Sequence, residues 1–468
     1  ILAQVVRVGP IAAHLIFERS TVGLADMAVR TLAACLLASA APTSLGAEWA
    51  VIVAGSSGYM NYRHQADACH AYKIAVAQGI PASNIILMSA DDVAHDEDNP
   101  FPGKLFNRPD PKGPGVDVYA GCKIDYRGDE VTPANFLKIL AGKGDGKVLK
   151  STSEDHVFIN FVDHGAPGII AFPSEEMHKT TLQKALGDMR KAGMFNKLVF
   201  YLEACESGSM FEGMNIPGVY ALSAANGEES SFGTYCDNSV VNGKDLDTCL
   251  GDLFSIAWME DSDSHDMTSE TLEVQFERVR TRTNLSHVLQ WGDKSFVEDP
   301  VSDFLGAMPR VAPVGSAAAP PLYAGDAVSA REVDLRRHVR AYAAGRTPEV
   351  RLRAAARLQA ELAQQQEAEL AYQRFLDAVL PGDAAEQRAL RERKAKPDRP
   401  DCEMDVHAAI RVGCAGRFDA NSGFALRFHQ IVVNVCDAVA RGLDADPRAA
   451  AAAVCGGNPG AGVAQLVV

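Results

Sequence analysis

A cysteine and a histidine each stand at the end of an apolar run. In LVFYLEACESG, residues 198–208, the run leads to Cys205, and in HVFINFVDHG, residues 156–165, it leads to His164. Apolar, β-branched and aromatic runs that end in small residues and glycine are typical of buried strands at their carboxyl ends. A thiol becomes a nucleophile when a neighbouring imidazole holds it as thiolate. The two motifs therefore predict a Cys205–His164 pair for acyl transfer.

Each residue taken alone also has a structural interpretation. A free cysteine is often a small buried side chain. Glu203 and Glu206 next to Cys205 also disfavour a thiolate, unless a nearby base or cation offsets their negative charge. The strand-end position of both residues favours catalysis, because α/β proteins place their chemistry there. We also expect a helix to begin just after Gly208, and the N–H groups of Gly165 and Cys205 to form an oxyanion hole.

A third candidate segment, AGSSGYMNYRHQADACHAYK, comes after another apolar run, at residues 54–73. Its glycines do not complete the G-x-G-x-x-G pattern of a dinucleotide loop, so we expect no such cofactor. Asn61, Arg63 and His64 are more informative, since they lie just beyond the carboxyl end of the first predicted strand. They should therefore lie at the same edge as Cys205 and His164.

Apolar runs alternate with helical stretches between residues 49 and 292, which predicts a mainly parallel sheet with helices on both faces. Helical stretches separate the expected strands, which are WAVIVAG, NIILMSA, HVFINFV, KLVFYLEA and VYALSAA. Residues 308–326 are rich in Pro, Ala and Gly and indicate a linker. Residues 330–380 have the composition of amphipathic helices, with a break at 345–348. The fold class is thus α/β with a C-terminal all-α region.

The pattern divides the chain into four segments. We expect an N-terminal extension with a signal peptide over 1–47, a catalytic domain over 48–305, a linker or activation peptide over 306–332, and a helical prodomain over 333–468 with a disordered tail after its last cysteine. The signal peptide would begin at Met27, with cleavage after Ala40 or Ala47. It predicts entry into the secretory pathway.

The composition limits the partners. The net charge of -15 argues against nucleic acid and anionic membranes, and no segment has the length of apolar residues that a membrane span needs. Ten cysteines in an exported chain indicate disulfides. We expect one local disulfide between Cys236 and Cys249, and two among the cysteines of the C-terminal region. Those four cysteines are Cys402, Cys414, Cys436 and Cys455. Cys35 would leave with the signal peptide, so Cys69, Cys122 and Cys205 remain, each a buried free thiol or a reactive one.

Many blocks of the chain resemble the legumain family of asparaginyl endopeptidases, also called vacuolar processing enzymes. The resemblance runs from about residue 49 to 292, is weaker in the C-terminal region, and suggests the plant and algal type. It is carried by NYRHQADACHAY, DDVAHDEDNPFPGKLFNRP, DVYAGCKIDYRGDEVTPANF, FVDHG, YLEACESGSMF, AANGEESSFGTYC, CLGDLFSIAWMEDSD and SHVLQWGD.

The resemblance implies a caspase-like fold with no cofactor and no metal. It makes Cys205 the nucleophile and His164 the general base and acid; Asn61 would orient the imidazole and Gly165 would lie at the oxyanion hole. The implied S1 pocket consists of Arg63, His64, Glu203, Ser231 and Asp252. A carboxamide offers one acceptor and two donors, so a cation opposite an anion suits asparagine. The expected reaction is cleavage after Asn, after protonated Asp at acidic pH, or ligation when an amine replaces water.

The resemblance also implies control by the chain itself. Partners would be protein and peptide substrates with exposed Asn, with the C-terminal prodomain as inhibitor, in a vacuole, a lysosome or outside the cell. The linker has Ser329 and Ala330 where plant relatives have Asn or Gln, so the alternatives are cleavage at Asp326 and activation by another protease. A catalytically silent binding protein of the same fold is the competing interpretation, but no residue of the expected site is lost.

Overall fold

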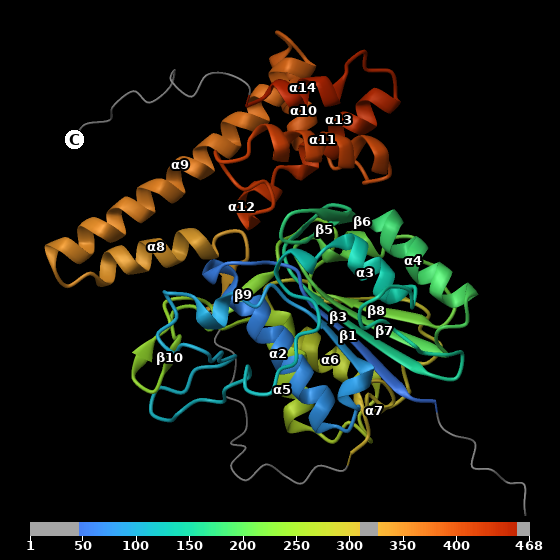
Figure 1. Ribbon diagram of the computed structural model, residues 1–468. Helices are drawn as coiled ribbons and strands as arrows, with labels where there is room; N and C mark the ends of the chain where they lie inside the picture. The colour runs from blue at the N-terminus through green and yellow to red at the C-terminus, as the bar shows by residue number, and fades with distance from the viewer. Residues whose placement is uncertain (1–45, 309–325, 456–468) are drawn as a thin grey trace, which may run out of the picture. The chain divides into compact units, whose positions relative to one another are not determined.

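A six-stranded sheet forms the centre of the fold in the computed structural model, which describes residues 46–308 and 326–455 (Figure 1). Its strand order is β13-β8-β7-β3-β1-β2, and all neighbours are parallel except the edge strand β13. The strands are β1 (Glu48–Ala54), β2 (Ile85–Met88), β3 (His156–Val162), β7 (Lys197–Glu203), β8 (Val219–Ser223) and β13 (Leu289–Gly292). The predicted mainly parallel sheet is confirmed. The expected signal peptide, most of the linker and the tail lie outside the described residues.

Alternate side chains of the central strands enter two separate hydrophobic cores. Ile52 of β1 packs in the core with Trp258, whereas its neighbour Val53 packs in the other core with Phe136. Figure 1 shows helices on both sides of the sheet. They are α2 (Tyr62–Ala77), α5 (Leu253–Ser264), α6 (Leu272–Arg282) and α7 (Ser302–Leu305) for the first core, and α3 (Pro133–Leu140) and α4 (Lys179–Lys191) for the second. The strands are buried on both faces, which explains their continuous apolar sequences.

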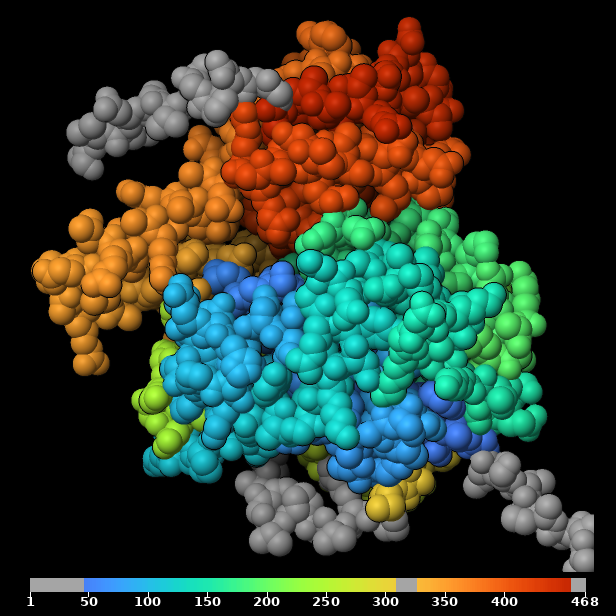
Figure 2. Space-filling model, in the orientation of Figure 1, coloured from blue at the N-terminus to red at the C-terminus, as the bar shows by residue number. Residues whose placement is uncertain are grey.

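Helix starts obey local capping chemistry. The side chain of Thr132 accepts a hydrogen bond from the Asn135 N–H, and Pro133 occupies the first turn of α3. Thr347 and Pro348 do the same for α9, which explains the predicted break before it. Figure 2 shows the segment between β1 and β3, in blue and teal, on the lower part of the face in view, with the C-terminal helices in orange and red above it.

The expected helix after Gly208 is wrong. Only a four-residue 3₁₀ turn, Ser207–Met210, comes after Cys205. Glu206 has a left-handed backbone with φ 48°, and the Gly208 N–H donates to the Ala225 carbonyl instead of to a preceding turn. Backbone donors here are used by tertiary contacts, so no helix dipole supports the thiolate.

Short antiparallel strands that the sequence did not indicate surround the strand ends. They form three small sheets: β4 (Gly165–Ala166), β5 (Ile169–Ala171) and β6 (Glu176–His178); β12 (Gly251–Asp252), β9 (Phe232–Thr234) and β14 (Val328–Ser329); β10 (Val240–Val241) and β11 (Lys244–Asp245). Strands of two or three residues carry too few side chains for a readable alternation.

The C-terminal region is helical, as predicted, and has its own core around Tyr372, Phe375 and Ile410. Its helices are α8 (Val333–Ala344), α9 (Pro348–Val379), α10 (Ala384–Glu392), α11 (Pro400–Gly413), α12 (Gly423–Leu426), α13 (His429–Ala440) and α14 (Pro447–Ala453). Among the described helices, none is long and apolar enough to cross a membrane.

The disulfides correct one expectation. Cys236–Cys249 forms as predicted, and the C-terminal cysteines pair as Cys402–Cys436 and Cys414–Cys455. Cys69 and Cys122, expected as free thiols, form a fourth disulfide that ties α2 to a loop 53 residues further along the chain. Their distance in sequence hid this pair. Among the described residues Cys205 is the free cysteine, and it is buried.

Candidate active site

Three adjacent strands deliver the candidate catalytic residues to one edge of the sheet. The register aligns Ala54 of β1 with Val162 of β3, and Val162 with Glu203 of β7. Asn61 lies beyond the end of β1, His164 beyond β3 and Cys205 beyond β7. Parallel strands in register end level, so the predicted convergence of these residues is found.

The imidazole of His164 is held in one orientation. Its Nε2 lies 2.8 Å from Asn61 Oδ1, and the Asn61 amide donates to the Ser57 carbonyl, which fixes the amide so that its oxygen faces the ring. Nε2 therefore carries the proton, and Nδ1 is left as the acceptor. Nδ1 is buried without a hydrogen-bond partner in the described chain. Burial, then the charges of Arg63 and Arg331, lowers the pKa of His164 well below its usual value.

Cys205 and Gly165 approach each other closely. A Cβ at Gly165 would lie 2.6 Å from the Cys205 carbonyl oxygen, so only glycine fits between the two strand ends. Cys205 is 1% exposed, and its Sγ lies 3.3 Å from Ser230 Oγ and 3.7 Å from Ser231 Oγ. Cys205 thus lies beside the backbone of Gly165, with two hydroxyls around its sulfur.

A buried ion pair forms the centre of the expected S1 pocket. Arg63 Nε donates to Asp252 Oδ1 at 2.9 Å, and both side chains are 1% exposed. Arg63 Nη2 and Asp252 Oδ2 have no hydrogen-bond partner in the described chain. Leaving a buried donor or acceptor unpaired costs free energy. Unpaired atoms of this kind are expected in a binding site, where a bound ligand supplies the missing partners.

The remaining pocket residues join this pair. Glu203 Oε2 accepts from the N–H and hydroxyl of Ser255, while its Oε1 is buried without a partner in the described chain. Burial, then the charge of Asp252, raises the pKa of Glu203 well above its usual value. His64 Nε2 lies 3.5 Å from Asp252 Oδ2. Burial, then Arg63 and His164, lowers the pKa of His64, so the pocket holds a neutral imidazole beside the guanidinium.

Sequence reasoning missed several supporting residues. Asp67 accepts from Asn107 Nδ2 at 2.6 Å and from the Asp252 N–H at 3.0 Å, which holds Asp252 in place. Asp67 lies one helical turn beyond Arg63 on α2, and that spacing could have identified it. Ser56 hydrogen-bonds His64 Nδ1 at 2.6 Å, a contact that no sequence pattern indicated.

One group in the site has the composition of a metal site. Single ligand atoms of His64, Asp163 and His164 lie within 4.8 Å of one another, and Asp163 Oδ2 is buried without a partner in the described chain. Arg63 is a strong electrostatic neighbour of both imidazoles, which disfavours a cation here. The prediction of no metal in this site remains a prediction.

Comparison with known proteins adds an independent observation. The model of the family described as Peptidase C13 matches residues 48–307. Legumain from Rattus norvegicus is 40% identical over 406 residues, which are 85% of this chain and 90% of the relative. The chain belongs to the Peptidase C13 family. As a member it is a cysteine-type endopeptidase that acts on protein substrates, as the sequence predicted.

Two further relatives show how identity is distributed. Legumain from Mus musculus is 50% identical over 279 residues, 58% of this chain and 61% of the relative. The vacuolar-processing enzyme delta-isozyme from Arabidopsis thaliana is 46% identical over 281 residues, 57% of this chain and 59% of the relative. The expected plant or algal type is not confirmed, because the rat protein matches over far more of the chain. Caspase-1 from Spodoptera frugiperda has a TM-score of 0.33 at 10% identity over 56% of this chain and 91% of its own, which decides nothing about the fold.

Proposed function

We propose that this Peptidase C13 protein cleaves peptide bonds after asparagine and is held latent by its own C-terminal helices. The observation that supports this specificity is the buried pair with two atoms unpartnered in the described chain, Arg63 Nη2 and Asp252 Oδ2. A substrate carboxamide would accept from the guanidinium and donate to the carboxylate, so both atoms would be satisfied at once. Lysine would meet Arg63 with like charge, and an alkyl side chain would leave both atoms unpaired.

The geometry supports a thioester mechanism. His164 Nδ1 takes the Cys205 proton, and the thiolate attacks the carbonyl carbon of the substrate asparagine. The tetrahedral intermediate collapses when the imidazolium donates its proton to the leaving amine, and the acyl group remains on sulfur. A water molecule, deprotonated by His164, then releases the acid and restores the thiol. Ligation would take the same course with an amine in place of water.

The linker lies where an extended peptide could bind. Val328 and Ser329 of β14 pair antiparallel with Gly233 and Phe232 of β9, and the Ala330 N–H donates to the Ser231 carbonyl at 2.9 Å. Ser231 is also the residue beside the Cys205 sulfur. A strand added to this edge is a common way to hold a peptide, so the linker supports the inhibitor role expected for the C-terminal region.

We call the linker residues 328–331 together with the C-terminal helices the cover. The cover also contacts the proposed catalytic histidine, His164. A Cβ at Gly423, the first residue of α12, would lie 3.1 Å from His164 Cε1. Arg331 Nη1 donates to the Gly423 carbonyl and Nη2 to the Gly165 carbonyl, and the guanidinium pairs with Glu206. We propose that these contacts exclude substrate until the linker is cut. We call the loop closed by the Cys236–Cys249 disulfide the Cys236 loop. Asp326, the proposed alternative cleavage site, lies against this loop, since its Oδ1 accepts from the Asn238 N–H at 3.2 Å.

The compartment and acid behaviour belong to the same proposal. Four disulfides require an oxidising route, which suits secretion to a vacuole, a lysosome or the outside. Below about pH 4 a substrate aspartate is protonated and imitates asparagine, so cleavage after Asp should become possible.

The test uses matched fluorogenic peptides with Asn, Asp, Ala or Lys before the scissile bond. Acid-treated protein should prefer Asn, and Cys205→Ala should abolish turnover. Arg63→Gln should reduce kcat/KM for the Asn peptide by about a hundredfold or more, with less effect on the Ala peptide. Equal losses for both peptides would contradict the pocket. Absence of turnover by fully processed protein would favour the binding-protein alternative, and an amine nucleophile in the same assay would reveal ligation.

A further inference from the structure

The loop between α5 and α6 holds two buried carboxylates and a partly exposed imidazole. Asp261 lies in the last turn of α5, His265 comes directly after that helix, and Glu270 lies just before α6. One ligand atom from each lies within 4.8 Å of the other two. The side chains of Asp261 and Glu270 are each 3% exposed, whereas His265 is 43% exposed. Charged groups have thus been buried next to an opening to solvent.

The protein itself balances this negative charge incompletely. Arg278 Nη1 contacts Glu270 Oε1 and lies 3.7 Å from Asp261 Oδ1, so one guanidinium faces both carboxylates. Glu270 Oε2 remains buried without a hydrogen-bond partner among the described residues. A buried carboxylate oxygen without a donor is the feature that a bound cation would explain.

We propose that Asp261, His265 and Glu270 form a binding site for a divalent transition-metal ion of the Zn²⁺ class. The imidazole decides the class, because Zn²⁺ accepts mixed nitrogen and oxygen ligands whereas Ca²⁺ and Mg²⁺ prefer oxygen alone. His265 Nδ1 already lies 3.0 Å from Asp261 Oδ1, and a small adjustment brings both atoms onto one ion. Water would fill the fourth position on the exposed side.

Neighbouring residues support the ligands. Gln275 Nε2 lies 3.5 Å from Asp261 Oδ2, and the Tyr201 hydroxyl donates to Gln275 Oε1, so a buried chain orients one carboxylate. Arg278 is 40% exposed and can swing into solvent when a cation takes its place.

The site would act on stability, not on the reaction. It joins the end of α5 to the start of α6, and the opposite end of α5 begins at Asp252 of the pocket. A metal bound only by the folded chain stabilises it by mass action. The proposal does not depend on asparagine specificity.

The experiment is isothermal titration calorimetry of the full chain with Zn²⁺ alone at neutral pH, in a Cys205→Ala background that removes the free thiol found among the described residues. We expect one strong site and a Zn²⁺-dependent rise in Tm. His265→Ala should weaken that site by about tenfold or more, and Arg278→Gln should strengthen it because the competing guanidinium is gone. Neither variant replaces a residue of the core.

The matched control is His287→Ala. His287 Nδ1 lies 2.9 Å from Glu229 Oε2, so it is an exposed histidine paired with a carboxylate. This variant should bind Zn²⁺ as the parent does. Equal affinity in the parent and His265→Ala, or weakening by Arg278→Gln, would overturn the proposal and indicate adventitious binding at other histidines. Equal loss in His265→Ala and His287→Ala would overturn it as well.

Discussion

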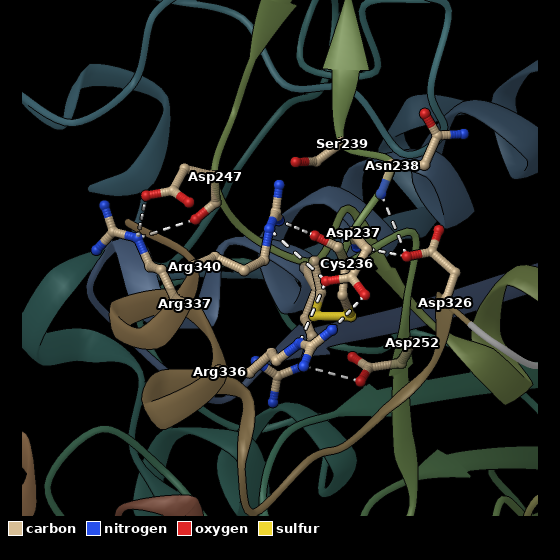
Figure 3. Close-up of a disulfide and its surroundings, with 12 residues drawn as sticks. Cys236, Asp237, Asn238, Ser239, Asp247, Asp252, Asp326, Arg336, Arg337 and Arg340 are labelled. Carbon is tan, nitrogen blue, oxygen red and sulfur yellow. Dashed lines mark hydrogen bonds and ion pairs between the residues drawn. A yellow bond between two sulfur atoms is a disulfide. The ribbon is translucent and has the colours of Figure 1, made fainter. Parts of the chain in front are cut away.

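Two of the contacts between the C-terminal helices and the catalytic domain use different chemistry. The first is made by arginines of α8, which face carboxylates of the Cys236 loop (Figure 3). Arg336 pairs with Asp237 at 2.5 Å and Arg340 with Asp245 at 2.9 Å, and all four side chains are at least 19% exposed. This contact is rich in charge and open to solvent.

The second contact is made by histidines of β6, α11 and α13, and it is buried. His178 of β6 lies 3.1 Å from Glu403 of α11, and His407 of α11 lies 3.4 Å from Glu176 of β6. His429 Nδ1 lies 3.3 Å from His407 Nδ1. Apart from the partly exposed Arg411, which also reaches Glu176, these side chains are at most 2% exposed.

Because the two contacts differ in chemistry, we expect them to respond to different changes in the solution. Arginine stays charged at every physiological pH, and exposed pairs are weak and screened by salt. Histidine changes charge near neutral pH, and burial magnifies the consequence. We therefore expect the arginine contact to respond mainly to salt, and the histidine contact mainly to acid.

The largest effect is expected at Arg331, where the cover reaches the candidate catalytic residues. Arg331→Ala leaves the Glu206 carboxylate, which is only 12% exposed, without its cation, which should cost about 3 to 5 kcal/mol of the free energy that holds the cover. The intact chain should then turn over a small Asn peptide at neutral pH, where we expect no turnover by the uncut parent. Removing both partners, with Glu206→Gln added, should cost less than the single change; an equal or larger cost would contradict the pairing.

Removing the fourth disulfide, Cys69–Cys122, should lower stability by a comparable amount. It should leave the pH at which the cover opens unchanged. Replacing Cys69 and Cys122 together by Ala should lower the free energy of unfolding by about 2 to 5 kcal/mol, because the unfolded chain gains freedom. Chemical denaturation of the full chain measures this. A shift in the pH at which the cover opens would show that α2 is linked to the histidine contact, which we do not expect.

A smaller effect, specific to acid, is expected at His429. Burial, then the charges of His407, His178 and Arg331, lowers the pKa of His429 well below its usual value. Since the covered state disfavours the charged ring, stability from His429 is present above the usual pKa and lost as pH falls below about 6.5. His429→Gln should move opening to lower pH by roughly half a unit or more.

The pH midpoint of opening is measured by hydrogen exchange of β6 and α11 as a function of pH, in the Cys205→Ala chain. His407 and Glu176 change the stability of the cover in other pH ranges. Burial opposes the charge on His407, yet Glu176 raises its pKa, so its stability is lost as pH rises. Burial opposes the charge on Glu176 too, but His407 and Arg411 lower its pKa, so its stability is lost only in stronger acid. If the pH midpoint of opening is unchanged in His429→Gln, protonation of His429 does not cause the loss of stability below about pH 6.5.

The smallest effect is expected at the exposed arginines. Arg336→Gln should change the stability of the cover by less than about 1 kcal/mol, and the difference should vanish in high salt. Hydrogen exchange of α8 at low and high salt tests this. A large effect that persists in salt would remove the distinction between the two contacts.

The sequence by itself determined the central sheet and the positions of Cys205, His164 and Asn61. Parallel strands buried on both faces have continuous apolar sequences, and the residues just beyond their carboxyl ends must meet at one edge. The resemblance added the pocket residues, and the structure brings Arg63 and Asp252 together although 189 positions separate them. Their roles in recognition remain predictions until the peptide assay is done.

Only the tertiary structure decided the contacts between distant segments. The Cys69–Cys122 disulfide, the histidine contact and the Arg331 bridge join residues whose spacing carries no periodic signal. The missing helix after Gly208 has the same cause, since long-range hydrogen bonds there outweighed local preference. Local sequence decides which elements form, whereas long-range packing selects which polar groups become partners, and here those partners cover the candidate catalytic histidine, His164.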